Sequence, residues 1–362
     1  MTELVTRRIG LLGFGNVGRR FCELVARTED ELAERHGLRL RFVAVGTATH
    51  GSLLTPSGVA AAEVLELAGA GGRRRPFGDR EVPGVELLRA SGADVLVEAT
   101  PLDPSGGSLA IAHIEAALAG GADAITVNKG PIAWDYRRLA ALAAAAGRRL
   151  LFEGTVMDGC PVFNLFRSCL PGCRLLGFEA VYNSTTNFIL DAMGEGDGFA
   201  DALAQVQAAG YAEADPSHDI DGHDAAAKVA ALANVLMDAG MTPDDVPKDS
   251  IREVTPERIA AARRAGRRLR VVCTARRDGA GRGPADDGVP GAIGGPGGRV
   301  DGAVRLTELD ADHPLYSAGG STLSVLLQTD LMGTVQIAEI GALPEQTAYA
   351  VYSDLIALHE GR

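Results

Sequence analysis

The chain of 362 residues contains only three lysines, Lys129, Lys228 and Lys248, against a large excess of arginine. Arginine keeps its charge at ordinary pH, whereas a lysine withdrawn from water can shift its pKa and exchange a proton. Biased base composition in a gene can favour arginine, but it does not explain where the lysines remain. These three positions are therefore candidates for places where a proton moves.

The densest group of polar residues lies in GYAEADPSHDIDGHDAAAKVAALANVLM, residues 210–237. The second half has the composition and apolar spacing of a helix. Asp224 and Lys228 are four residues apart and share a face of that helix, and Glu213 precedes them in a loop that can fold over the helix start. Taken alone, this pattern is more typical of a surface ion pair with an acidic capping loop than of an active site.

A nucleotide-binding pattern lies near the amino terminus, in RRIGLLGFGNVGRRFCELVAR. Gly13, Gly15 and Gly18 form G-x-G-x-x-G between an apolar strand run and a helical pattern. The first glycine permits a tight turn, the second lets a pyrophosphate approach, and the third lets the helix pack on the strand. The helix start then presents N–H groups to the phosphates, which predicts binding of NAD or NADP.

The end of the second strand bears on the choice between these two cofactors. An acid there usually binds the ribose 2′-hydroxyl of NAD, but this strand ends in VAVGTATHG, with no acid before Gly51. A 2′-phosphate would meet no repulsion, and Thr47, Thr49 or His50 could hydrogen-bond it, although no arginine is present. NADP is therefore modestly favoured. A solvated loop is the alternative interpretation of Thr49 and His50.

Strand-like runs at 40–46, 94–100, 123–128 and 149–154 alternate with alanine-rich helical segments. Nearly continuous apolar strands separated by helices predict an α/β fold with a parallel sheet covered on both faces. The second half changes character, because residues 175–190 read as a strand, a polar turn and a helix. A chain of this length suggests two domains.

Composition excludes several classes of partner. A formal net charge of −12 argues against a nucleic acid or an anionic membrane, and no apolar run approaches the roughly 20 residues of a membrane helix. The first residues run almost directly into a strand, without room for a signal peptide. Five cysteines, an odd number, favour reduced thiols. We expect a cytoplasmic protein.

Over nearly its whole length the chain resembles the homoserine dehydrogenase family. The matching segments are GFGNVG, ADVLVEATPLDPSGGSLAIAHIEAALAGGADAITVNKGPIA, NSTTNFIL, GYAEADPSHDIDGHDAAAKVA, LQTDLMGTV and TAYAVYSDLIAL. The resemblance implies reversible hydride transfer between NAD(P)H and L-aspartate 4-semialdehyde, giving L-homoserine for threonine, methionine and isoleucine synthesis. It also implies a homodimer that pairs through the second domain.

The resemblance also assigns roles to individual positions. Lys129 and Lys228 match the two active-site lysines, while Glu213 and Asp224 match acids that hold the amino end of the substrate. Further implied substrate contacts are Thr155, Asn183, Thr185 and Thr186. The implied cofactor contacts, besides Thr47 and Thr49, are Gly13, Phe14, Gly15, Asn16, Val17, Gly18, Thr100, Pro101, Asn128, Lys129 and Gly341.

This chemistry explains why lysine would be required. Hydride addition turns the aldehyde oxygen into an alkoxide, which needs a positive charge and then a proton. Lysine supplies both, whereas arginine is a very poor acid. We hypothesise that Lys228 or Lys129 donates the proton and that the other polarises the oxygen or orients the substrate. Lys248 lies in a polar stretch and is expected to be solvated.

Two turns depart from the family pattern. FEGTVMDGCP replaces a glycine-rich turn whose carbonyls can hold a monovalent cation such as Na⁺, and the candidate ligands are Glu153, Val156 and Asp158. Asp158 would strengthen that site, approach the substrate or occupy an exposed turn. AEIGALPEQTA keeps only Gly341 of a loop that approaches the nicotinamide. A dehydrogenase for another small amino or hydroxy aldehyde, or a non-catalytic nucleotide-binding protein, therefore remains an alternative.

The expected organisation has two domains. A Rossmann-type domain with a parallel sheet covers residues 1–154 and is completed by 341–362. An α+β catalytic and dimerisation domain with an open mixed sheet covers 155–340, with a flexible insertion rich in glycine and proline at 277–299. Nothing of length follows YSDLIALHEGR, so we expect the short form of the family, without a carboxyl-terminal regulatory ACT domain.

Overall fold

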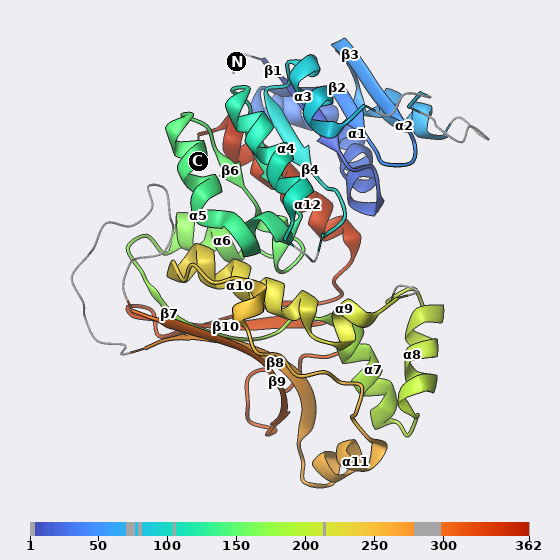
Figure 1. Cartoon of the computed structure of the whole chain (residues 1–362), viewed down its shortest axis with the longest axis vertical. Helices are drawn as coiled ribbons and strands as arrows, with labels where there is room; N and C mark the ends of the chain where they lie inside the picture. The colour runs from blue at the N-terminus through green and yellow to red at the C-terminus, as the bar shows by residue number, and fades with distance from the viewer. Residues whose placement is uncertain are drawn as a thin grey trace. The chain divides into compact units, whose positions relative to one another are not determined.

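The computed structural model describes residues 4–69, 77–78, 82–103, 106–212, 215–278 and 298–361 (Figure 1). These residues form two compact units. The first unit contains the described chain up to Pro161 and again from Leu343 onward. The second runs from Val162 to Ala342.

The first unit is built on a six-stranded sheet of order β3-β2-β1-β4-β5-β6. Its strands are β1 (Val5–Leu12), β2 (Leu38–Gly46), β3 (Ser52–Val59), β4 (Val95–Glu98), β5 (Asp123–Thr126) and β6 (Leu150–Leu151). All neighbours pair in parallel except β3, which pairs antiparallel with β2 at the edge. The predicted Rossmann-type sheet is confirmed, and β3 is an addition. Its polar sequence, which contains proline and glycine, suits an edge strand and escaped the apolar pattern.

Helices cover both faces of this sheet and bury a separate apolar core on each. One core joins the sheet to α1, α2 and the last helix, α12, and the other joins it to α3, α4 and α5. The bounds are α1 (Asn16–His36), α2 (Ala61–Gly69), α3 (Gly84–Ser91), α4 (Ser108–Ala119), α5 (Lys129–Ala145) and α12 (Pro344–His359). Val351 and Leu355 of α12 are buried in the first core, so the end of the chain returns to pack with its beginning.

The second unit contains a five-stranded sheet of order β11-β10-β7-β8-β9. The strands are β7 (Leu175–Val181), β8 (Arg268–Arg277), β9 (Val300–Leu309), β10 (Leu323–Thr329) and β11 (Thr334–Glu339). Every neighbouring pair of these strands is antiparallel, so the prediction of a mixed sheet is wrong in this respect. The reason is connectivity, because β8 and β9, and likewise β10 and β11, follow one another directly and pair as antiparallel neighbours.

Helix α10 is the buried helix of the second unit and contacts β7, β8 and β9. It begins and ends within the segment predicted as a helix from its apolar spacing. The helices of this unit are α6 (Val162–Asn164), α7 (Ser184–Gly194), α8 (Phe199–Ala208), α9 (Ser217–Ile220), α10 (His223–Met237) and α11 (Pro256–Arg264). Short helical turns are η1 (Glu153–Thr155) in the first unit and η2 (Leu165–Cys169) and η3 (Pro243–Asp245) in the second.

Two further predictions concern the insertion in the second unit and membrane-spanning helices. The insertion predicted at 277–299 falls between β8 and β9, and its residues 279–297 lie outside the described part of the chain. Within the described residues, no helix combines the length and apolar character needed to cross a bilayer.

Candidate active site

The glycine-rich turn connects β1 to α1. Gly13 has a positive φ of 96°, and a Cβ there would lie 2.2 Å from the carbonyl oxygen of Ala99. A Cβ on Gly18 would lie 2.3 Å from the carbonyl oxygen of Gly13, so these two positions require glycine for packing. A Cβ on Gly15 would meet nothing within 4 Å. The space above Gly15, at the uncapped start of α1, therefore fits a phosphate group.

The other residues of this turn have different surroundings. Phe14 packs edge-on against Phe77, with ring centroids 5.0 Å apart, and the guanidinium of Arg19 lies 5.6 Å from its centroid. Asn16 is exposed in the first turn of α1, while Val17 is half-buried against the core. Phe14 and Val17 thus stabilise the turn, and Asn16 faces solvent.

The turn after β2 is a hairpin in which one of the predicted contacts is already engaged. The hydroxyl of Thr47 donates to the carbonyl of Gly51 at 2.9 Å and accepts the backbone N–H of His50 at 2.8 Å. Thr49 Oγ1 and His50 Nδ1 are 2.8 Å apart and exposed. Thr49 and His50 are therefore better placed than Thr47 to meet a 2′-phosphate.

Four predicted residues converge at the carboxyl ends of β4 and β5, the edge where sheets of this kind bind nucleotides. The side-chain amide of Asn128 donates to the carbonyls of Thr100 at 3.1 Å and Pro101 at 3.2 Å. Its side-chain oxygen accepts the backbone N–H of Gly130 at 3.0 Å and so caps α5. Lys129 is the first residue of α5 and is half-buried.

In the second unit, Lys228 lies on α10 and is largely withdrawn from water. Its Nζ donates to the carbonyl of Tyr182 at 2.8 Å, and it lies 3.3 Å from Oδ2 of Asp224 and 5.5 Å from the centroid of the Tyr182 ring. The side chains of Lys228 and Asp224 are each only 14% exposed. The interpretation as a surface ion pair is therefore wrong. Lys248, the third lysine, is half-buried.

Asn183 joins this pair to an acid that the sequence analysis missed. Its side-chain oxygen accepts the N–H of Thr186 at 2.8 Å, which caps α7, and its Nδ2 donates to Asp219 at 2.8 Å and to Asp224 at 3.1 Å. Burial, and then the nearby Asp224 carboxylate, raise the pKa of Asp219 above its ordinary value. Two carboxylates beside one amide favour a cationic ligand.

Asp219 was missed because it lies before the break between α9 and α10, where helical spacing cannot relate it to Asp224. The only signal was the number of acids in DPSHDIDGHD, which does not single out one of them.

The predicted threonines use their hydroxyl hydrogens on backbone carbonyls. Thr186 donates to Asn183 at 3.1 Å, Thr185 donates to Tyr211 at 2.9 Å, and in the first unit Thr155 donates to Phe152 at 2.8 Å. Their oxygens can still accept a hydrogen bond from a ligand. Glu213, the other predicted acid, lies outside the described residues.

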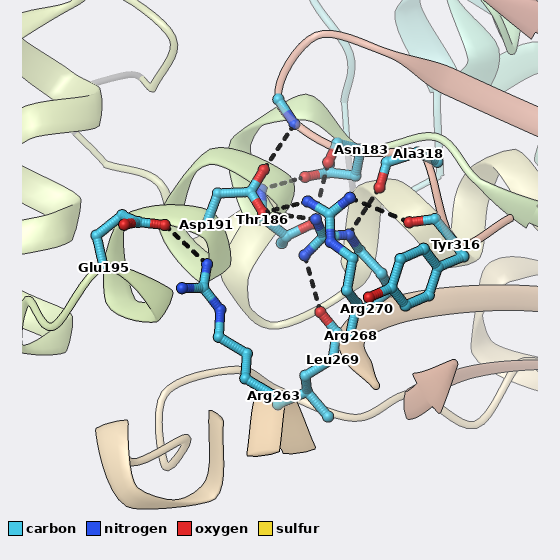
Figure 2. Close-up of polar contacts among 11 residues, drawn as sticks. Asn183, Thr186, Asp191, Glu195, Arg263, Arg268, Leu269, Arg270, Tyr316 and Ala318 are labelled. Carbon is cyan, nitrogen blue, oxygen red and sulfur yellow. Dashed lines mark hydrogen bonds and ion pairs between the residues drawn. The ribbon is translucent and has the colours of Figure 1, made fainter. Parts of the chain in front are cut away.

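Helix α7, which begins at the Asn183 cap, is anchored at its other end by Asp191 (Figure 2). Asp191 accepts hydrogen bonds from Arg268 at 2.9 Å, from Arg270 at 2.5 Å and from the backbone of Gly320 at 3.0 Å. Arg270 is 2% exposed and also donates to the carbonyls of Ala318 and Leu269. This cluster fixes α7 to β8 and to the segment before β10.

The turn after β6, which differs from the family pattern, packs against the start of α12. The carboxylate of Asp158 accepts a hydrogen bond from Thr347 at 3.0 Å, and Asp158 is half-buried with a φ of 45°. An exposed turn, one of its three predicted states, is therefore excluded. Glu153 and Val156 are buried. No cluster of three or more His, Cys, Asp or Glu side chains suited to a metal occurs in the described chain.

Gly341 lies in the second unit, close to the return of the chain to the first unit, with a φ of 73°. Lys129 belongs to the first unit and Lys228 to the second. The approach of both amines to one nicotinamide stays a prediction.

Two family models match the chain. Residues 13–153 match the NAD binding domain of homoserine dehydrogenase, and residues 161–356 match the homoserine dehydrogenase domain.

Known proteins agree with these matches. The chain is 36% identical to an NAD(+)-dependent homoserine dehydrogenase of Pseudomonas canavaninivorans, over 99% of this chain and 97% of that protein. It is 30% identical to a homoserine dehydrogenase of Methanocaldococcus jannaschii, over 96% and 97%. It also matches the structure of a hyperthermophilic archaeal homoserine dehydrogenase in complex with NADPH, with a TM-score of 0.79, 26% identity and coverage of 99% of both chains. The chain belongs to the homoserine dehydrogenase family.

Proposed function

We propose that this protein is a homoserine dehydrogenase that interconverts L-homoserine and L-aspartate 4-semialdehyde with a nicotinamide cofactor. The observation that carries the proposal is the cluster of Asp219, Asn183, Asp224 and Lys228, largely withdrawn from water, in the second unit. It places two acids suited to an ammonium group beside a lysine suited to an oxygen that gains negative charge.

The acids hold the substrate. Asp219 and Asp224 bind its α-ammonium group, and Asn183 fixes both carboxylates in place. Because they are held before the substrate arrives, they orient its carbonyl carbon at little further entropic cost. Glu213 is proposed as a third acid toward the same ammonium.

Proton transfer is assigned to the two lysines. The bound nicotinamide supplies the hydride that reduces the aldehyde carbon. The electron pair of the C=O bond then moves to oxygen, and an ammonium of Lys228 or Lys129 neutralises the charge and gives up its proton. In Lys228, the Tyr182 carbonyl and Asp224 hold the ammonium in one orientation.

Both nicotinamide cofactors fit the first unit, and we propose a modest preference for NADP. In support, the hairpin after β2 has no acid to repel a 2′-phosphate and exposes Thr49 and His50. The relatives point both ways, because the Pseudomonas enzyme is named NAD(+)-dependent and the archaeal structure contains NADPH.

Three further features complete the proposal. A homodimer would cover the edge strand β11 and the exposed Leu331 and Met332 in the turn before it. A monovalent cation such as Na⁺ would be held by Glu153, Val156 and Asp158, and the Asp158 carboxylate also accepts a hydrogen bond from Thr347. The protein would act in the cytoplasm, in keeping with its five free cysteines.

The test is oxidation of NADPH, followed by its absorbance, when aspartate semialdehyde is added to the purified chain. The measurement is repeated with NADH and with other small amino or hydroxy aldehydes. Rapid oxidation that depends on aspartate semialdehyde supports the proposal. Cofactor binding without turnover, or faster turnover of another aldehyde, contradicts it.

A further inference from the structure

Glu98 is a buried carboxylate that the proposed reaction does not use. It is the last residue of β4 and is 0% exposed. Removing a charged carboxylate from water costs several kcal/mol unless partners compensate for the lost hydration. The partners of Glu98 should therefore show what its carboxylate is needed for.

Three hydrogen-bond donors from two strand ends point at this carboxylate. Oε1 accepts the backbone N–H of Thr100 at 3.2 Å and also its hydroxyl, and Oε2 accepts the hydroxyl of Thr126 at 3.1 Å. His113, itself 3% exposed, places Nδ1 3.7 Å from Oε1. Gly84 makes room for that imidazole, because a Cβ there would lie 2.3 Å from its Nε2. The surroundings of Glu98 thus suit a carboxylate that accepts hydrogen bonds.

The same hydrogen bonds continue to the start of α5. Thr126 Oγ1 accepts the backbone N–H of Asn128 at 3.0 Å, and the Asn128 amide returns to the carbonyl of Thr100 at 3.1 Å. Glu98, Thr100, Asn128 and Thr126 therefore form a closed ring. Asn128 caps α5, whose first residue is Lys129, so the ring fixes the backbone from which Lys129 projects.

We infer that Glu98 is a positioning residue that sets the place of Lys129 through Thr126 and Asn128. Its role in turnover rests on the proposed function, because that is where Lys129 receives its part in the reaction. Glu98 acts through its neighbours, since its two oxygens are engaged by Thr100 and Thr126.

A matched control exists at the opposite end of the sheet. Asp123, 7% exposed, is the first residue of β5, and its Oδ1 accepts the backbone N–H of Arg149 at 2.8 Å. Like Glu98, it is a buried carboxylate that joins neighbouring strands. It lies at the amino end of β5, however, and Lys129 follows the carboxyl end. Replacing Asp123 therefore measures the effect of losing a buried carboxylate on activity while the ring around Glu98 stays intact.

The experiment compares five variants of the full chain, Glu98→Gln, Thr126→Val, Thr126→Ser, Asp123→Asn and the double variant Glu98→Gln/Thr126→Val. Glutamine keeps the size of Glu98 but places a donor where the carboxylate accepts, valine removes the Thr126 hydroxyl, and serine keeps it. We expect kcat to fall about tenfold to a hundredfold in Glu98→Gln and Thr126→Val, with KM for the semialdehyde nearly unchanged. The double variant should be no worse than the poorer single one, because both break one ring. Thr126→Ser and Asp123→Asn should stay within about threefold of the parent chain.

A second readout does not depend on activity. The chain has only three lysines, so an amine-acetylating ester followed by peptide mass spectrometry reports each of them separately. The labelling rate of Lys129 relative to Lys248 should change about threefold or more in Glu98→Gln and Thr126→Val, because the reactivity of a lysine amine depends on its surroundings. It should not change in Thr126→Ser or Asp123→Asn.

The outcomes separate this inference from the proposed function. An inactive parent chain contradicts the proposed function, while the labelling ratio still tests the ring. If the parent is active and Glu98→Gln and Thr126→Val match it in kcat and labelling, or if Asp123→Asn loses as much activity, the inference fails. Should Glu98→Gln not fold, the contrast between Thr126→Val and Thr126→Ser decides.

Discussion

Replacing Asp219 by asparagine should make the protein more stable and a poorer enzyme. Asp219 and Asp224 both bind the Nδ2 of Asn183, so their carboxylates lie within about 6 Å of each other. Two like charges at that distance repel by about 3 kcal/mol at an effective dielectric constant of 20. The raised pKa of Asp219, caused by burial and by Asp224, shows the same penalty on its charged form.

The variant removes this repulsion but also removes the attraction to Lys228 and weakens the hydrogen bond from Asn183. A bond to a charged group contributes about 1 kcal/mol more than a neutral one, which leaves a gain of at most about 2 kcal/mol before the lost attraction to Lys228 is subtracted. The raised pKa of Asp219 shows that the repulsion and burial outweigh the attraction, so the unfolding free energy at neutral pH should still increase. Because the pKa of Asp219 is raised on folding, ionisation costs the folded state more than the unfolded state, and this penalty shrinks as the pH falls through the raised pKa. The gain should therefore disappear as the pH falls below the ordinary value of 3.8, where both states bind the proton.

The same change should weaken substrate binding. Loss of one carboxylate from the α-ammonium group removes about 1.5–3 kcal/mol, equivalent to about a 10- to 150-fold fall in kcat/KM, mostly through KM. Urea unfolding at neutral and acid pH measures the first effect, and initial rates over a range of semialdehyde concentrations measure the second.

Asp221, two residues further on, provides the control with the opposite sign. Hydrogen bonds from Arg252 lower the pKa of Asp221, so its charged form stabilises the fold at neutral pH and that stability is lost as the pH falls through its lowered pKa. Asp221→Asn should be less stable by up to about 1 kcal/mol and keep its KM. The reasoning is refuted if Asp219→Asn is destabilised as Asp221→Asn is, with normal kcat/KM.

Three further expectations follow from the two units. Lys129→Arg and Lys228→Arg should each lower turnover by about a hundredfold or more, with NADPH binding by fluorescence titration retained, and near-normal turnover in both would contradict their assignment. Gly15→Ala should fold normally but bind NADPH about tenfold more weakly, because a Cβ would occupy the open space over the turn. Gly13→Ala should instead lower the melting temperature, and equal melting temperatures for these two glycine variants would count against the geometry. Arg270→Leu should reduce the unfolding free energy by about 3 kcal/mol in urea unfolding, since Asp191 loses a buried partner, and an unchanged midpoint would show that α7 is held otherwise.

Local sequence patterns were sufficient to predict most elements of the first unit, because each of these elements depends on the spacing of residues close together in the chain. The glycine turn, the apolar strands and the helices between them each follow a short-range rule, and the structure has them where those rules place them. Strand β3 is the exception, because its Thr, Pro, Ser and Gly residues become a strand only by pairing with the exposed edge of β2.

The burial of polar side chains and the identity of their hydrogen-bond partners could not be predicted from local sequence. A spacing of four residues between Asp224 and Lys228 is the same on a surface helix as on a buried one, and only the packing of α10 on the second sheet withdraws the pair from water. The sequence left three states open for Asp158, and its hydrogen bond from Thr347, almost two hundred residues later, exists only in the folded chain.

The amino-acid order alone therefore determined the nucleotide-binding turn, the succession of strands and helices, and which positions keep lysine, because each depends on neighbours within a few residues. The tertiary structure decided that the second sheet is antiparallel, that Asp219 joins Asp224 at Asn183, and that Glu98 ties two strand ends to the helix of Lys129. A polar group's partners and its distance from water are set by segments far apart in the chain, so they exist only once the chain is folded.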